Sequence, residues 1–213
     1  MDIRDRLDRA LLYLVTPSKP GGVHLDDFLP RVLEAGVDMV QLREKDLEDA
    51  ALLRHAETGR RRAEEFGAIF ILNDRADLAV ASGAHGLHLG QDDLPIEAAR
   101  EILGDGPIIG LSTHCTQEIL NAQTSSVDYI GVGPVHATPT KPGRPAVGYE
   151  LVEFAAERSS IPFYAIGGID LKTLPEAIAA GARRVSVLRG VTESQDPASA
   201  VRAMKRVLLD VHP

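Results

Sequence analysis

The sequence is poor in cysteine and in aromatic residues. Its 213 residues include one cysteine, Cys115, and no tryptophan, and aromatic side chains make up 4% of the chain. A single cysteine excludes an intrachain disulfide framework and gives no cysteine-histidine pair with the spacing of a zinc site. Because this cysteine usage is typical of a reducing interior, we expect a cytoplasmic protein.

The chain also has no excess of positive charge and no long hydrophobic run. Lys and Arg total 23 against 31 Asp and Glu, which gives a net charge of −8. This balance does not favour binding to nucleic acid or to an anionic membrane surface. The first apolar run, residues 10–15, is too short for a signal sequence or a membrane span. We expect neither nucleic acid nor membrane as a partner, and any bound phosphate must be held locally.

What the chain does contain is a regular alternation of two patterns. Short apolar or β-branched runs alternate with longer stretches of helical spacing, and such alternation predicts a parallel sheet. The predicted strands cover residues 11–16, 39–44, 69–73, 86–90, 108–112, 129–133, 163–167 and 185–189. The predicted helices cover residues 25–35, 48–66, 96–103, 116–122, 149–157, 171–180 and 197–209, and the short segment 75–82 also has helical composition.

The number of these repeated units favours a closed barrel. Eight β/α units within 213 residues match a TIM barrel, and none of the runs resembles an exposed edge strand. We therefore predict the α/β class and a single (β/α)8 TIM barrel that spans residues 1–213 as one catalytic domain. An open, doubly wound sheet is the alternative.

Polar residues gather where the predicted strands end. Strands of a barrel are covered on both faces and are normally apolar, so these residues need a reason. One reason is ordinary helix N-capping, for which Asp, Asn and Ser are favoured. The other is an active site, which barrels assemble at the C-terminal ends of their strands. The residues concerned are Gln41, Arg43, Glu44, Lys45, Asn73, Asp74, His88, Gln91, Asp92, Asp93, Ser112 and His114.

Two carboxylates among these residues suit a magnesium ion. Asp74 ends the third predicted strand and Asp93 follows the fourth, so neighbouring strands would bring them together. Mg²⁺ commonly takes one or two carboxylates and completes its octahedron with water and substrate phosphate. Asp92 competes with Asp93 for this role, because one of the two could instead cap the helix that begins near Leu94.

Two other segments favour phosphate binding. Gly167 and Gly168 end the seventh predicted strand, and the eighth ends at Leu188 and Arg189. Glycines allow backbone N–H groups to approach an anion closely, and the loops after strands seven and eight of barrels often hold phosphate. The long loop 135–148 adds cations and hydroxyls between prolines, which suits an anion clasp, although a solvated polar loop is the alternative. These hydroxyls and cations belong to Thr138, Thr140, Lys141 and Arg144.

Taken together and in order, the strand-end segments resemble the thiamine phosphate synthase family over nearly the whole chain. Any one of these segments is unspecific, whereas the ordered set is specific. The segments are QLREK at 41–45, NDR at 73–75, GLHLGQDD at 86–93, GLSTH at 110–114, GVGP at 131–134, TPTK at 138–141 and IGGI at 166–169.

The resemblance implies a Mg²⁺-dependent transferase of thiamine biosynthesis with two small phosphorylated substrates. It would join 4-amino-5-hydroxymethyl-2-methylpyrimidine diphosphate to 4-methyl-5-(2-hydroxyethyl)thiazole phosphate through a pyrimidine-methyl cation, and would release diphosphate. Fixed cations and a metal would stabilise the leaving group, which agrees with the lack of a convincing nucleophile in the sequence.

The resemblance also assigns roles to individual residues. It places Mg²⁺ on Asp74 and Asp93, and the pyrimidine against Gln41 and His88. The residues implied for the diphosphate are Arg43, Lys45, Asn73, Ser112 and Lys141, of which Arg43, Lys45, Ser112 and Lys141 would be catalytic. Those implied for the thiazole phosphate are Thr138, Thr140, Gly168, Leu188 and Arg189.

Two departures and several rival functions remain open. Pro17 follows Thr16 where relatives commonly carry an acidic residue, and Arg189 stands where many carry Ser. A thiazole tautomerase resembles the synthase in fold and would use His114 for acid-base chemistry, but it needs no carboxylate-bound diphosphate. A non-catalytic sensor of phosphorylated ligands is the rival from another class, and a sugar-phosphate enzyme on the same barrel is a further one. A homo-oligomer is compatible with the sequence.

Overall fold

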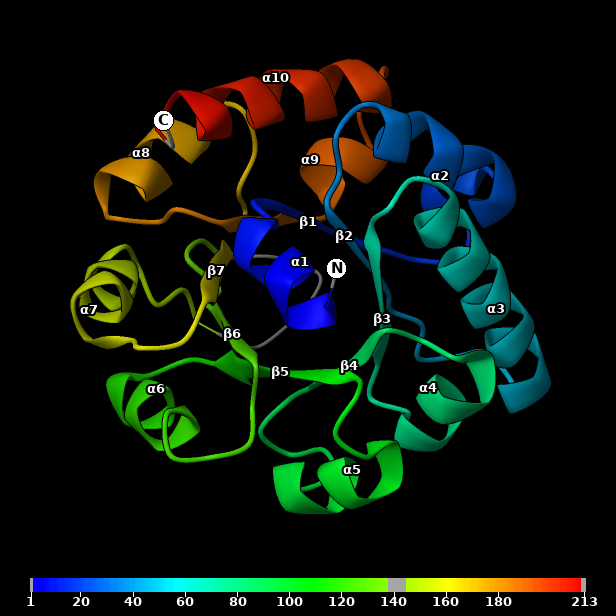
Figure 1. The fold of residues 1–213 in the computed structure, drawn as a ribbon. Coiled ribbons are helices and arrows are strands. Elements are labelled where there is room, and N and C mark those ends of the chain that lie inside the picture. The colour runs from blue at the N-terminus through cyan, green and yellow to red at the C-terminus, as the bar shows by residue number, and fades with distance from the viewer. Residues whose placement is uncertain (1, 138–144, 212–213) are drawn as a thin grey trace.

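A computed structural model, which describes residues 2–137 and 145–211, shows a closed barrel of parallel strands (Figure 1). The strands follow one another in chain order around the barrel, and the last pairs with the first. The barrel prediction is confirmed, and the alternative of an open sheet is wrong. The strands are β1 (Leu12–Thr16), β2 (Met39–Leu42), β3 (Ile69–Asn73), β4 (Gly86–Leu89), β5 (Ile108–Thr113), β6 (Tyr129–Val132), β7 (Phe163–Ile166) and β8 (Val185–Val187).

A ring of helices covers the outside of the barrel. In α2, the buried residues Leu25, Phe28, Leu29 and Val32 recur at helical spacing and form one apolar face. Among the residues that the structure describes, no helix has the length and hydrophobicity needed to cross a bilayer. The helices are α1 (Ile3–Arg9), η1 (Pro20–Gly22), α2 (Leu25–Glu34), α3 (Asp49–Glu65), α4 (Ala76–Ser82), α5 (Ile96–Leu103), α6 (Thr116–Ala122), α7 (Glu150–Arg158), α8 (Leu174–Ala179), α9 (Arg189–Thr192) and α10 (Pro197–Asp210).

Two α-helices of the described chain, and the short 3-10 helix η1, were not predicted from the sequence. Helix α1 starts after Asp2, whose side chain accepts the backbone N–H of Ile3, and it buries only Leu7. One buried residue gives no periodic apolar stripe, so the sequence pattern could not show this helix. Helix α9 is four residues long and includes Arg189, which the sequence prediction had placed in strand β8. That strand ends two residues earlier, at Val187.

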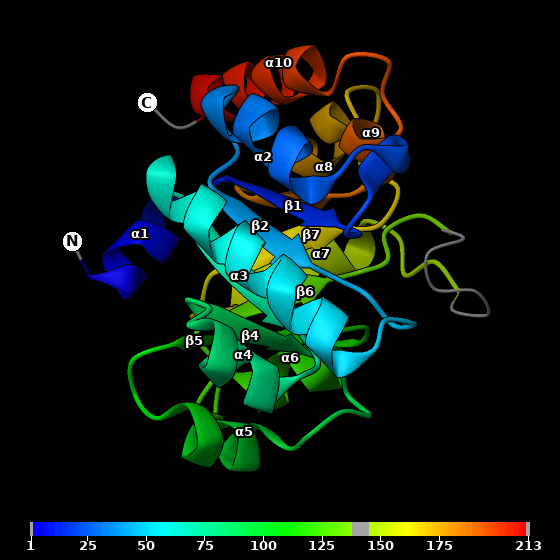
Figure 2. The same cartoon turned by 90° about the vertical axis from the view of Figure 1, so that its right-hand side faces the viewer.

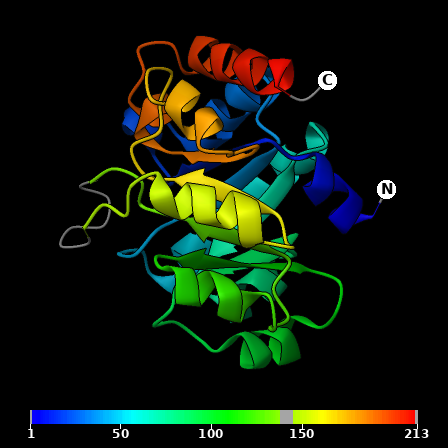
Figure 3. The same cartoon turned by 90° about the vertical axis from the view of Figure 1, so that its left-hand side faces the viewer.

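The interior of the barrel is divided along its axis. Near the N-terminal ends of the strands it is filled by Met39, Ile69 and Ile108 and by three tyrosine rings. Figures 2 and 3 show α1 lying across this end of the barrel, and Leu7 of α1 belongs to the same core cluster. Solvent is thereby excluded from this end, and the residues that predict chemistry lie at the other.

Glycine makes room for one of the tyrosines. A Cβ atom on Gly110 of β5 would lie 2.1 Å from the ring of Tyr129 on the neighbouring strand β6. Real carbon atoms do not approach so closely, so only glycine fits at this inward position. Gly110 therefore allows the Tyr129 ring to occupy the centre of the barrel.

Candidate active site

A cavity of about 600 Å³ opens at the C-terminal ends of the strands. It is here that barrel enzymes carry their active sites. Of the residues predicted from the sequence, Thr138, Thr140 and Lys141, together with Arg144, lie outside the described residues. The other residues to which the resemblance assigns roles all line this one cavity: Gln41, Arg43, Lys45, Asn73, Asp74, His88, Asp93, Ser112, Gly168, Leu188 and Arg189. Of the remaining polar residues at the strand ends, His114 lines it, whereas Glu44, Gln91 and Asp92 do not.

Strand alternation explains why these residues meet. Residues two positions apart on a strand share a face, so the side chains of Met39 and Gln41 both point into the barrel. Gly110 and Ser112 of β5 share the inward face in the same way. The register places Asn73 of β3 beside His88 of β4. The cavity thus receives one or two polar side chains from each of several neighbouring strands.

Helix capping does not account for the polar strand ends. The N-caps of α4, α5 and α6 are Arg75, Pro95 and Cys115, and none of these three forms a side-chain capping bond. Helix α5 begins at Ile96, as in the predicted range 96–103, so neither Asp92 nor Asp93 lies at its N-cap. The capping alternative is therefore wrong for Asp74, Asp92 and Asp93.

Asp74 is held in an unusual backbone conformation next to Asp93. Its φ of 64° is the only positive value among the described non-glycine residues. Asp is among the residues that tolerate this region, and such backbone conformations cluster at functional sites. The backbone N–H of Asp74 donates to the carbonyl oxygen of His88 at 2.9 Å, which fixes the turn after β3.

The two carboxylates lie close enough to interact directly. Burial raises the pKa of Asp74, and the adjacent carboxylate of Asp93 raises it further, while Lys45 opposes both effects. The Lys45 ammonium lies 3.4 Å from Oδ2 of Asp74. Oδ2 of Asp93 accepts the backbone N–H of Gly90 at 2.7 Å. Two neighbouring carboxylates that are both ionised repel each other unless a cation lies between them.

This pair fits a magnesium ion that shares its coordination with a substrate. The described residues contain no group of three or more His, Cys, Asp and Glu side chains placed to hold a metal. Two carboxylates without a protein cage match Mg²⁺, which leaves positions for water and phosphate oxygens. Asp93 lines the cavity and Asp92 does not. The structure thus favours Asp93 over Asp92 as the partner of Asp74.

A chain of hydrogen bonds runs through the barrel beneath the cavity. Nε2 of His88 lies 2.9 Å from Oγ of Ser112, and its Nδ1 lies 3.1 Å from the hydroxyl of Tyr129. The hydroxyls of Tyr129 and Tyr13 are 2.9 Å apart, and the amide of Gln41 donates to Tyr13. Both nitrogens of His88 and the amide of Gln41 are thereby held in place before any ligand binds.

The two tyrosines of this hydrogen-bond chain, Tyr13 and Tyr129, were not predicted as site residues from the sequence. Burial raises the pKa of both Tyr13 and Tyr129 well above the ordinary value, so both phenols stay protonated. The available signal was tyrosine at inward positions of short strands, opposite the glycine at position 110. This signal is hard to recognise because an aromatic residue in a strand usually only packs in the hydrophobic core.

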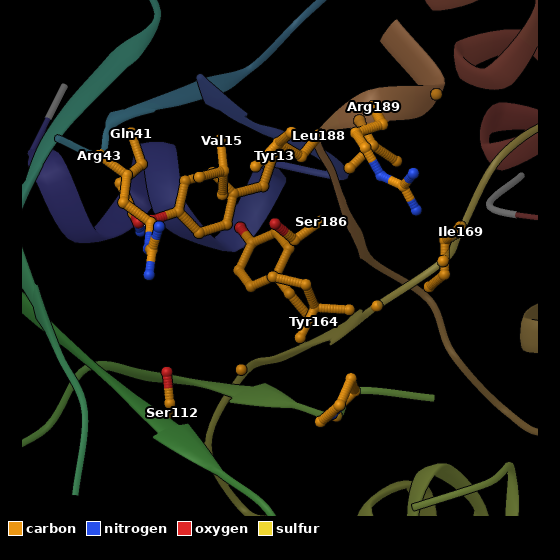
Figure 4. Close-up of a pocket in the computed structure, with 18 of the residues that line it drawn as sticks. Tyr13, Val15, Gln41, Arg43, Ser112, Tyr164, Ile169, Ser186, Leu188 and Arg189 are labelled. Carbon is orange, nitrogen blue, oxygen red and sulfur yellow. The ribbon is translucent and has the colours of Figure 1, made fainter. Parts of the chain in front are cut away.

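The opposite side of the cavity is built by the turns after β7 and β8. Gly167 and Gly168 have φ values of 104° and 69°, which other residues rarely adopt. Leu188 precedes the first turn of α9, and Arg189 is its first residue. Figure 4 shows Leu188 and Arg189 across the cavity from Gln41 and Arg43, with Tyr13 and Tyr164 between them.

His114 also lines the cavity, but its ring is not presented as an acid or base. Within residues 2–137 and 145–211, both ring nitrogens are buried and have no hydrogen-bond partner. Its backbone N–H donates to Glu118 at 2.6 Å. A catalytic acid or base is usually oriented by a second side chain, and no described side chain holds this ring. The tautomerase alternative therefore gains no support from this residue.

Comparison with known sequences identifies close relatives. Residues 12–191 match the family described as thiamine monophosphate synthase. A thiamine-phosphate synthase of Thermobifida fusca is 46% identical over 209 residues, which cover 97% of this chain and 96% of the relative. One of Acidothermus cellulolyticus is 49% identical over 193 residues, covering 90% of this chain and 91% of the relative.

Solved structures show the same barrel. A thiamine phosphate pyrophosphorylase from Pyrococcus furiosus superposes with a TM-score of 0.89 at 29% identity, and the match covers 100% of both chains. A 3-hexulose-6-phosphate synthase from Salmonella typhimurium has a TM-score of 0.69 at 18% identity, over 95% of this chain and 100% of that one. At that lower identity the likeness concerns the fold alone.

Proposed function

We infer the chemistry of this cavity from the family to which the chain belongs, the thiamine monophosphate synthases. The enzyme is a transferase of thiamine biosynthesis that moves a pyrimidinylmethyl group. In the proposed reaction the pyrimidine-methyl diphosphate loses diphosphate. The ring nitrogen of the thiazole phosphate then attacks the methylene carbon of the resulting cation, which gives thiamine phosphate.

The diphosphate is proposed to lie at the side of the cavity formed by β2, β3 and β4. Asp74 and Asp93 would hold Mg²⁺, which neutralises charge on the departing diphosphate. Fixed cations act in the same way without moving during the reaction. The cations assigned to the diphosphate are Arg43 and Lys45, together with Lys141, which lies outside the described residues, and the neutral Asn73 and Ser112 are assigned to it as hydrogen-bonding groups.

The pyrimidine is proposed to rest on the buried hydrogen-bond chain. Gln41 and His88 are both less than a tenth exposed and both line the cavity. Their polar atoms are oriented by Tyr13 and Tyr129. A rigid and dry contact of this kind orients the ring and keeps water away from the cation.

The thiazole phosphate is proposed to lie at the opposite side, on Gly168 and on the backbone of Leu188 and Arg189. Backbone N–H groups at such turns suit a phosphate, and barrels often use this location. Thr138 and Thr140, which the resemblance adds to this site, lie outside the described residues. The observation that carries the proposal is the arrangement of one cavity with an acid pair and cations at one side and a glycine turn at the other.

A single assay tests this function. The purified enzyme is incubated with both substrates and Mg²⁺, and diphosphate and thiamine phosphate are measured together. We expect equal amounts of the two products, and no turnover after Mg²⁺ is removed with a chelator. Substrate binding in a calorimeter without product would instead favour the sensor. A cytoplasmic location and a homo-oligomer remain predictions from the sequence.

A further inference from the structure

The segment after β6 crosses directly over the glycine turn after β7. The backbone N–H of Val135 donates to the carbonyl of Ile166 at 2.8 Å, and that of His136 donates to the carbonyl of Gly167 at 3.1 Å. A Cβ atom on Gly168 would lie 2.7 Å from Cβ of His136. His136 therefore packs against the backbone of Gly168, and any side chain at position 168 would displace it.

The side chain of His136 continues this contact toward the next helices. Its Nε2 lies 2.9 Å from the hydroxyl of Tyr149, and the two rings meet edge to face with centroids 5.3 Å apart. The Tyr149 hydroxyl in turn lies 3.4 Å from the carbonyl oxygen of Thr173. Oγ1 of Thr173 donates to the carbonyl of Gly168 at 3.0 Å. These contacts form a closed circuit that begins and ends at the glycine turn.

Burial and acidic neighbours both keep the phenol of Tyr149 protonated. Burial raises its pKa to about 12, with further contributions from a hydrogen bond to Glu176 and from the charges of Glu176 and Asp170. A protonated phenol donates one hydrogen bond and accepts others. It can therefore donate toward Thr173 or Glu176 and accept from the ring N–H of His136 at the same time.

We propose that His136 and Tyr149 are positioning residues for the thiazole phosphate, because together they hold the Gly167-Gly168 turn in its binding conformation. This inference rests on the proposed function of that turn. Glycine offers only backbone groups to a ligand and samples many conformations. The orientation of its N–H must therefore come from neighbouring residues, and the circuit supplies them.

The direct test removes one hydroxyl. In the Tyr149→Phe variant we expect KM for the thiazole phosphate to rise about three- to tenfold, the range that one hydrogen bond supports. KM for the pyrimidine diphosphate stays within about twofold, because its site lies at the other side of the cavity. Hydrogen exchange of the peptide spanning residues 163–173 becomes faster, and this readout does not depend on activity.

A matched pair of variants at position 136 separates hydrogen bonding from packing. His136→Gln keeps a side-chain N–H donor, whereas His136→Phe keeps a ring and loses the donor. We expect the Gln variant to retain much of the affinity for the thiazole phosphate and the Phe variant to behave like Tyr149→Phe. In the double variant with Phe at positions 136 and 149 the loss is no larger than in either single variant, because both remove one interaction.

A distant variant controls for general destabilisation. His85 lies directly before β4, away from the cavity, and its side chain accepts the backbone N–H of Phe70 in β3. His85→Ala removes this acceptor. It should lower the melting temperature without changing either KM. The proposal is overturned if the position-136 and position-149 variants also lower only the melting temperature, or raise both KM values equally. Failure of the wild-type enzyme to form thiamine phosphate would instead refute the proposed function.

Discussion

The two halves of the barrel interior differ in chemistry although the same strands build both. In β2 the inward residue Met39 is apolar, and Gln41, two residues later, is polar. In β3 the change falls between Ile71 and Asn73. The lower half is sealed by α1 and is packed with apolar side chains and three tyrosine rings, while the upper half opens into the cavity. Two positions along a strand thus separate residues that stabilise the fold from residues that we propose to serve the reaction.

The upper half carries a cost in stability that the lower half does not. Burial and the adjacent carboxylate of Asp93 both raise the pKa of Asp74, and two ionised carboxylates side by side repel each other. Such unfavourable contacts are typical of functional sites. Substitutions in the upper half should therefore lower activity and leave stability unchanged or higher. Substitutions in the lower half should lower stability and leave activity nearly unchanged.

The largest effect is expected at the acid pair. Asp93→Asn removes a proposed carboxylate ligand of Mg²⁺, while its amide oxygen can still accept the N–H of Gly90, so we expect kcat/KM to fall by at least about 100-fold. The melting temperature should stay equal or rise, since the repulsion with Asp74 is relieved. Asp92→Asn is the matched control and should keep its activity. A fully active Asp93→Asn enzyme would show that the metal lies elsewhere.

The reverse result is expected in the lower half. Ile69 is 1% exposed, and Ile69→Ala should lower the free energy of unfolding by about 2–4 kcal/mol. Its kcat/KM, measured well below the melting temperature, should stay within about threefold of wild type. Val80→Ala, at a residue that is 52% exposed, is the control and should change neither quantity. A selective loss of activity in Ile69→Ala would mean that the two halves are not separable.

A smaller, pH-dependent effect is expected at the start of β4. Burial lowers the pKa of His85 to about 4, and its Nδ1 accepts the backbone N–H of Phe70 at 2.9 Å. Below about pH 6.5 the unfolded chain takes up a proton at this residue and the folded protein does not. The contribution of His85 to the free energy of unfolding is therefore fully present above pH 6.5. It falls toward pH 4 by up to about 1.4 kcal/mol per pH unit.

Urea unfolding at pH 7.5 and pH 5 measures this dependence. The His85→Gln variant keeps a side-chain acceptor and has no group that titrates in this range. We expect it to lose less stability than the wild type between the two pH values. Equal losses in both proteins would remove His85 as the cause.

The smallest effect is expected at Arg189. Its side chain is exposed, so water screens its interaction with an anion. Arg189→Ala should raise KM for the thiazole phosphate only about two- to fivefold, provided that the backbone of Leu188 and Gly168 supplies the main contacts. Arg202→Ala, on the outer helix α10, is the control for loss of one positive charge. A much larger rise would make the Arg189 side chain the principal phosphate ligand.

Much of the fold could be predicted because alternation repeats along the chain. Each strand and most helices carried their own periodic signal, and the closed barrel follows from their number and order. Helix α1 gave no such signal, because a single buried leucine has no period. The end of β8 was placed too late, because Leu188 is as apolar as the strand residues before it.

Only some residues of the site could be predicted from the sequence. Polar residues such as Asn73 and Asp93 stand out after apolar strands, and the structure brings them to one cavity. Tyr13 and Tyr129 did not stand out, since their role depends on contacts across the barrel between residues that are 116 positions apart. The His136 and Tyr149 contact has the same origin. Pairings of this kind are set by tertiary structure, and no local pattern encodes them.

The most direct test of the account is a crystal of the enzyme with Mn²⁺, as a substitute for Mg²⁺, and inorganic diphosphate. We predict an anomalous peak between the carboxylates of Asp74 and Asp93, with the diphosphate bridging from the metal to Arg43 and Lys45. Diphosphate on the Gly167-Gly168 turn, with no metal at the acid pair, would contradict the division of the cavity into a metal-diphosphate side and a second phosphate side.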